Sequence, residues 1–177
     1  VSSSPLSLAD VRADFVAISY YKLFGYPTGV GALLLRHDAL AVLRRRYFAG
    51  GTVEFVAVQN DRFRLRNGAA SFEDGTPPFL AMPAVCDGLR WLTRIGMEKI
   101  QQHMGGLTAA MLDRLVSLGD RVRIYGPVDT QDRGGIIAFN LCDGDRVIDY
   151  EIVEAAARER GIAIRGGCFC NPGAAEH

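Results

Sequence analysis

One lysine stands where an amine could act as a nucleophile. Lys22 follows an apolar run, has aromatic neighbours and precedes three glycines within residues 19–31 (SYYKLFGYPTGVG). Partial desolvation there would disfavour the ammonium form and leave free amine to attack an aldehyde. The glycines would let the backbone approach a bulky cofactor, and the Ser19 hydroxyl could donate to a phosphate. The alternative is a surface lysine lying along aromatic rings, which local composition alone favours.

A second chemical signal is the Gly-rich segment at residues 165–173 (RGGCFCNPG), which holds Cys168 and Cys170. A thiolate is a sulfur nucleophile, and a nearby guanidinium such as that of Arg165 favours the thiolate form. A loop of small residues also leaves a thiol free to move. An inert small loop is the other interpretation.

The spacing Cys-x-Cys could also be half of a zinc site. A four-coordinate site needs a second pair of ligands, and Cys86, Cys142 and the isolated His103 show no such pairing. We therefore predict no metal. Four cysteines are too sparse for a disulfide framework, and a reducing compartment would keep them free.

A third segment, residues 72–77 (FEDGTP), stands before an expected helix start at Pro77-Pro78. Amides at a helix N-terminus bind anions, so the backbone at Gly75 and the Thr76 hydroxyl could contact a phosphate. An ordinary helix start without a ligand explains the same residues.

Apolar periodicity and turn residues predict the elements that position these groups. We predict strands at 14–19, 31–36, 53–58, 63–66, 122–125, 135–141 and 162–165. We predict helices at 38–47 with Asp38 as the cap, from Pro77-Pro78 to Gly96, at 97–118 and at 147–160. The turn at 59–61 predicts a hairpin, and the long third helix could link two domains.

Composition limits the classes of partner. The 177 residues are 49% hydrophobic, and 20 basic residues balance 20 acidic ones. Such a chain can bury a core, and it has no overall field that would attract nucleic acid or an anionic membrane. No apolar run is long enough to span a bilayer and no signal peptide is evident, so we expect a cytoplasmic protein with small-molecule and protein partners.

The lysine segment resembles the cofactor-lysine signature of class V aminotransferases, and residues 21–29 are similar to those of molybdenum cofactor sulfurases. The resemblance implies that Lys22 forms the Schiff base with pyridoxal phosphate and that Ser19 is a phosphate ligand. Most desulfurases have His where this chain has Tyr21, whose phenol can still donate one hydrogen bond to the phosphate.

The other two motifs occur in the order of the same family. Residues 72–77 resemble the Phe-Glu-x-Gly-Thr-Pro motif of cysteine desulfurases, which implies that Gly75 and Thr76 contact the phosphate held by a neighbouring subunit of a homodimer. The cysteine segment is similar to the Arg-Thr-Gly-Cys-Phe-Cys-Asn loop of the sulfurases, with Gly166 in place of Thr. The resemblance implies that Cys170 carries a persulfide, and Arg165 could stabilise the thiolate.

The resemblance implies an α/β fold: part of the large domain of a fold-type I enzyme over residues 1–105, then part of a small α+β domain over 106–177. It also implies that the groups that stack on the ring and pair with its nitrogen precede Val1, and that a carboxylate-binding arginine lies beyond His177. We therefore expect a fragment that is inactive on its own.

The expected function is a cysteine desulfurase-like sulfur transfer, with L-cysteine or a related amino acid as donor and the molybdenum cofactor as a candidate acceptor. Lys22 would move protons, and Cys170 would take the sulfur. One alternative is a class V aminotransferase or lyase that does not use Cys170. Another is a non-catalytic interaction or dimerisation module with the same fold.

Overall fold

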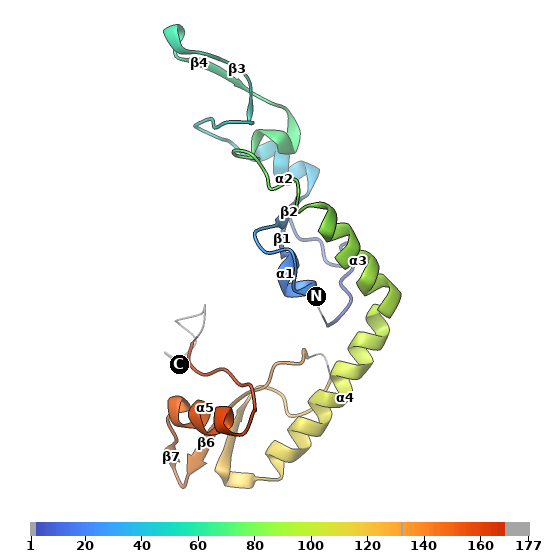
Figure 1. Ribbon diagram of the computed structural model, residues 1–177, viewed down its shortest axis with the longest axis vertical. Helices are drawn as coiled ribbons and strands as arrows, with labels where there is room; N and C mark the ends of the chain where they lie inside the picture. The colour runs from blue at the N-terminus through green and yellow to red at the C-terminus, as the bar shows by residue number, and fades with distance from the viewer. Residues whose placement is uncertain (1–2, 132, 169–177) are drawn as a thin grey trace. The chain divides into compact units, whose positions relative to one another are not determined.

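The computed structural model describes residues 3–131 and 133–168, and the chain forms two compact units, Val1–Ile100 and Gln101–His177 (Figure 1). The division lies within one long helix, α4 (Met97–Val116). The assignment of residues 1–105 and 106–177 to parts of a large and a small enzyme domain stays a prediction.

The first unit begins with an antiparallel pair, β1 (Phe15–Ser19) and β2 (Gly31–Leu35), as the apolar runs predicted. The short helix α1 (Tyr20–Phe24) follows β1 directly. A Cβ atom at Gly31 would lie 2.7 Å from the carbonyl oxygen of Ile18 on the paired strand, so only glycine fits there. The lysine segment is therefore a helix and loop closed by two paired strands.

The next helix, α2 (His37–Val42), is shorter than the predicted 38–47. Its N-cap is Arg36, and Asp38 instead forms an ion pair with that guanidinium and accepts from the amide of Ala39. The backbone turns extended at Leu43, and the arginines that follow bond to carbonyl oxygens. These side-chain bonds take the place of the helical ones that the sequence pattern predicted.

The predicted hairpin is confirmed. Strands β3 (Val53–Ala57) and β4 (Arg62–Leu65) pair antiparallel, joined through the 3-10 turn η1 (Val58–Asn60). Asp61 closes the turn at φ 48°, a left-handed conformation that Asp tolerates better than most residues.

Helix α3 (Pro83–Ile95) begins later than the predicted Pro77-Pro78. Separate turns follow the two prolines, because the amides of Phe79 and Ala81 bond to the carbonyls of Pro77 and Pro78. Pro83 then occupies the first helical turn, where its missing amide costs nothing. Gly96, at φ 89°, ends α3 as predicted, and α4 begins at the next residue.

The second unit contains the rest of α4 and a three-stranded antiparallel sheet in the order β5-β6-β7. The elements after α4 are η3 (Gly119–Arg121), β5 (Val122–Tyr125), β6 (Ala138–Asp143), β7 (Arg146–Val147) and α5 (Tyr150–Glu159). The strand predicted at 135–141 begins three residues later, as β6, and β7 was not predicted. The carboxylate of Asp149 caps α5 by accepting from the amide of Glu151 at 2.9 Å, so the helix begins after β7 rather than at Val147.

The strand predicted at 162–165 is wrong, because these residues pair with no strand in the described part of the chain. The amide of Ile162 bonds to the carbonyl of Ala157 at 2.9 Å, which turns the chain back against α5 instead of onto the sheet.

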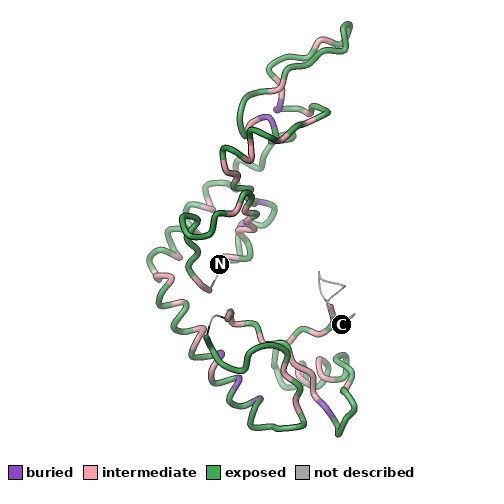
Figure 2. Tube along the Cα trace, turned by 180° about the vertical axis from the view of Figure 1, so that it is seen from behind, coloured by how far each residue is buried: buried purple, intermediate pink, exposed green. Residues whose placement is uncertain are grey.

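Buried residues occur in a few short stretches, and many large apolar side chains are exposed (Figure 2). The apolar core of the second unit includes Leu112, Leu115 and Cys142. Among the helices of the described residues, none combines the length and the apolar character that crossing a membrane requires.

Candidate active site

Lys22 lies on α1, immediately after β1, with Ser19 at the junction and Tyr21 beside it. Helix α1 ends at Gly25, whose amide bonds to the carbonyl of Tyr21 at 2.8 Å with φ at 85°. The positive φ suits glycine and turns the chain into the loop that leads to β2.

Helix α1 is positioned by one close contact with α3. A Cβ atom at Gly88 would lie 2.2 Å from the ring of Phe24, so the ring fills the space that any larger residue would need. Phe24 is two residues after Lys22, and this ring therefore fixes the helix that presents the lysine.

The partial desolvation predicted for Lys22 is wrong for the described chain, because the residue is exposed. Helix α1 has no buried residue. The Nζ atom lies 5.7 Å from the centroid of the Tyr21 ring, and among residues 3–131 and 133–168 it has no hydrogen bond or ion pair. The amine is thus free to react with a carbonyl compound.

The Gly75–Thr76 loop is held in place by the Gly50–Gly51 loop. The amide of Gly75 donates to the carbonyl of Gly50 at 2.8 Å, and a Cβ atom at Gly51 would lie 3.1 Å from the carbonyl oxygen of Gly75. Thr76 is exposed, and six residues lie between it and Pro83, the first residue of α3, so it does not lie at a helix N-terminus as predicted.

Arg45 anchors this pair of loops, and sequence reasoning missed it. Its side chain is only 5% exposed, and it donates to the carbonyls of Tyr47 and Ser71, each at 2.9 Å. Its Nη2 atom also lies against the carboxylate of Asp74, directly before Gly75, as an ion pair without hydrogen-bond alignment. Three consecutive arginines precede the paired glycines, and nothing in their order shows which one is buried.

We predict that Arg45→Met makes the Gly75–Thr76 loop, the candidate contact for the phosphate, more mobile. Removing a buried guanidinium leaves two carbonyls and a carboxylate without their partner, so peptides covering residues 71–76 should exchange amide hydrogens about tenfold faster. Hydrogen–deuterium exchange of the complete protein measures this. Arg64→Met is the matched control, because Arg64 is 68% exposed in its ion pair with Glu54 and should change exchange less than about twofold. Equal effects of the two changes would contradict the anchoring role.

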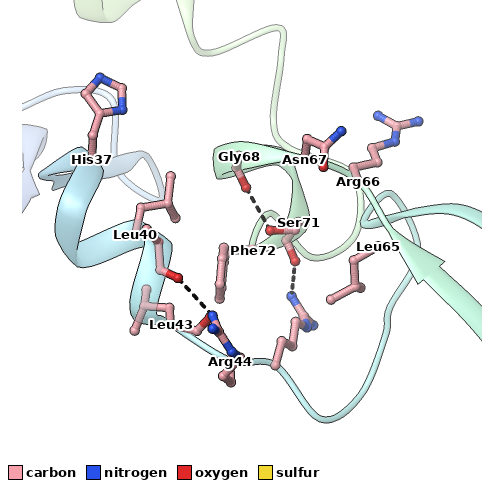
Figure 3. Close-up of a pocket in the computed structure, with 12 residues that line it drawn as sticks. His37, Leu40, Leu43, Arg44, Leu65, Arg66, Asn67, Gly68, Ser71 and Phe72 are labelled. Carbon is pink, nitrogen blue, oxygen red and sulfur yellow. Dashed lines mark hydrogen bonds between the residues drawn. The ribbon is translucent and has the colours of Figure 1, made fainter.

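A cavity of about 510 Å³ lies between α2, β4 and the 3-10 turn η2 (Gly68–Ser71) (Figure 3). No residue predicted to bind the cofactor lines it. Its lining includes Arg45 and two residues that support it. Arg45 donates to the Ser71 carbonyl, and the Ser71 hydroxyl donates to the Gly68 carbonyl at 2.7 Å. The cavity therefore belongs to the support of the Gly75–Thr76 loop.

The predicted site residues fall into separate groups. Ser19, Tyr21 and Lys22 share one short segment, and no hydrogen bond or ion pair of the described residues joins them to Gly75 and Thr76.

Arg165 and Cys168 belong to the second unit, where Cys168 is half-buried and forms no disulfide. Cys170 lies outside the described residues. Within the described part of the chain, no three His, Cys, Asp or Glu side chains converge on a point that could hold a metal.

The sequence from residue 1 to 176 matches the family described as aminotransferase class-V. The chain belongs to this family. A molybdenum cofactor sulfurase of Drosophila ananassae is 39% identical to this class-V chain over 196 aligned residues, which cover all of the chain and 25% of the relative. The chain thus spans about a quarter of the length of that curated relative.

Solved structures give the same fold. The apo cysteine desulfurase of Thermococcus onnurineus is 27% identical, with a TM-score of 0.83 over 96% of this chain and 40% of that protein. A variant of the enzyme C-DES with glycine covalently linked to its PLP cofactor is 20% identical, with a TM-score of 0.72 over 93% of this chain and 41% of that protein. The predicted fold-type I architecture is confirmed.

The residues around Lys22 fit pyridoxal phosphate. The group needs an accessible amine for its aldehyde and hydroxyl or amide donors for its phosphate. Lys22 supplies an exposed amine, and Ser19 and Tyr21 supply hydroxyls within the same segment. Cβ atoms at Gly25 and Gly29 would meet nothing within 4 Å, so the loop leaves open space on the side of the glycines.

Proposed function

We propose that the complete protein is a pyridoxal-phosphate-dependent sulfurtransferase that takes sulfur from L-cysteine and passes it on through Cys170. The supporting observation is the accessible Lys22 amine at a strand-to-helix junction, in a class-V chain that is 39% identical over its whole length to a molybdenum cofactor sulfurase. The proposed acceptor is the molybdenum cofactor.

The cofactor would supply an electron sink for the bonds of the bound amino acid. Lys22 would hold the cofactor, and after displacement by the substrate amine its own free amine would carry protons at the substrate carbon. Ser19 and Tyr21 would orient the phosphate with their hydroxyls. Thr76, held by the Arg45 anchor, would donate to the phosphate of a second subunit, which makes a homodimer part of the proposal.

Cys170 would be the sulfur nucleophile. Its thiol attacks the sulfur of the substrate, the carbon–sulfur bond breaks, and the substrate carbon gains a proton, so that one L-cysteine and one thiol give one alanine and one persulfide. Arg165, three residues before Cys168, would favour the thiolate. A cytoplasmic location stays a prediction.

The test is to incubate the complete protein with pyridoxal phosphate and L-cysteine and to measure alanine and protein persulfide together. We expect persulfide to form in one burst equal to the amount of active sites, with alanine accumulating further when a thiol acceptor is added. Pyruvate and ammonia as the main products would identify a lyase instead. Absence of both turnover and cofactor absorbance would favour a non-catalytic module.

A further inference from the structure

The cysteine segment begins with a chain reversal at the end of α5. Gly161, at φ 68°, follows the helix, and the amide of Ile162 bonds back to the carbonyl of Ala157. Residues 162–168 then return toward the beginning of α5, where Tyr150 and Glu154 lie. The segment that leads to Cys168 therefore runs along one face of α5.

The ring of Tyr150 covers the two glycines before Cys168. A Cβ atom at Gly166 would lie 2.2 Å from Cδ2, 2.8 Å from Cγ and 2.9 Å from Cβ of Tyr150. Such distances are excluded for real atoms, and no side-chain rotation gives full relief, because Cβ lies at 2.9 Å and moves only with the backbone of the helix. At Gly167, whose φ is 81°, a Cβ atom would meet the far end of the same ring at 3.6 to 3.8 Å.

A second attachment lies one helical turn further along. Residues 150 and 154 are on the same face of α5, since they are four positions apart in the helix. The Glu154 Oε1 atom accepts from the amide of Gly166 at 2.5 Å, in a part-buried position. A carboxylate acceptor makes this a strong hydrogen bond to the backbone. The ring blocks one side of Gly166, and the carboxylate holds its amide.

We propose that Tyr150 and Glu154 are positioning residues that fix the backbone at Gly166, two residues before Cys168, and so set where the Cys168 thiol can reach. This role rests on the proposed sulfur transfer. It also gives a physical reason for glycine at position 166: the Tyr150 side chain occupies the volume that a Cβ atom there would need.

The test measures how fast iodoacetamide alkylates each cysteine of the complete, folded protein, followed by mass spectrometry of peptides. Exposed Cys86 is the internal reference, and buried Cys142 reports any unfolding. Tyr150→Ala and Gly166→Thr should each speed alkylation of Cys168 by about threefold or more, because either change frees or displaces the loop. Tyr150→Phe keeps the ring and should behave as the unchanged protein.

The double variant distinguishes a specific contact between Tyr150 and Gly166 from a general destabilisation of the loop. With Tyr150→Ala already present, Gly166→Thr should have a much smaller effect, because the ring atoms at 2.2 and 2.8 Å are gone and only the contact with Cβ at 2.9 Å remains. The matched control is Gly134→Thr, whose Cβ would meet nothing within 4 Å, and it should leave Cys168 unchanged. Equal effects of Gly166→Thr in both backgrounds, or no effect of either single change, would overturn the proposal.

The alkylation experiment needs no cofactor and no turnover, so it fails or succeeds independently of the proposed function. A second measurement links the two proposals: Tyr150→Ala should slow persulfide formation, and alanine formation with it, while the cofactor absorbance stays unchanged. If alkylation of Cys168 becomes faster but persulfide forms at an unchanged rate, the contacts of Tyr150 and Glu154 do not serve sulfur transfer.

Discussion

Replacing Lys22 by alanine in the complete protein is expected to abolish the visible absorbance of bound pyridoxal phosphate and to reduce turnover by on the order of a thousandfold or more. The amine is accessible in the structure, and the only other lysine of the chain, Lys99, lies on α4. No other side chain of α1 can bond the aldehyde and later release it to a substrate amine. An absorbance spectrum and an alanine assay measure the two effects.

Lys99→Ala is the matched control, since Lys99 is also exposed but lies on a helix that carries no predicted cofactor contact. It should retain both the absorbance and the turnover. A visible band that persists in Lys22→Ala and disappears in Lys99→Ala would contradict the assignment and place the cofactor against α4.

Replacing Cys170 by serine is expected to stop persulfide formation while leaving the cofactor absorbance intact. A hydroxyl at neutral pH is a far weaker nucleophile than a thiol, so sulfur transfer should fall by roughly a hundredfold or more even though the side chains are similar in size. Mass spectrometry of the protein after incubation with L-cysteine measures the persulfide and its position.

Cys168→Ser is the control within the same loop and should have the milder effect. Cys168 is half-buried and lies directly after the glycines that Tyr150 covers, so the position of its thiol is restricted. Persulfide found on Cys168 alone would reverse the assignment of the two cysteines. Undiminished persulfide transfer in Cys170→Ser would favour a class V enzyme that does not use this residue.

Local patterns predicted the elements whose signals lie within the element. The paired strands around Lys22, the hairpin closed by Asp61 and the long helix α4 follow from apolar periodicity and turn residues, because neighbouring residues decide these features. Motif order also indicated the class-V family before any coordinates, since chemistry at a site constrains residue types more than packing does.

Element ends were predicted less well, because distant contacts decide them. Helix α2 stops at Val42 since Arg45 reaches the carbonyl of Ser71 and the carboxylate of Asp74, which are more than 25 residues away. Residues 162–165 have the composition of a strand, yet the hydrogen bond from the Gly166 amide to the Glu154 carboxylate, twelve positions earlier, holds this stretch against α5. Secondary-structure propensity depends on neighbouring residues, so it does not include contacts that form only when the chain folds.

The sequence by itself determined which residues could do the chemistry: the one lysine after an apolar strand, the Gly-Thr-Pro segment and the paired cysteines. Only the tertiary structure decided how they are held. Phe24 fits against Gly88, Arg45 fixes the Gly75 loop, and Tyr150 fills the space beside Gly166. Reactivity depends on the type of a side chain, whereas its position depends on packing between residues far apart in the chain, which no local pattern encodes.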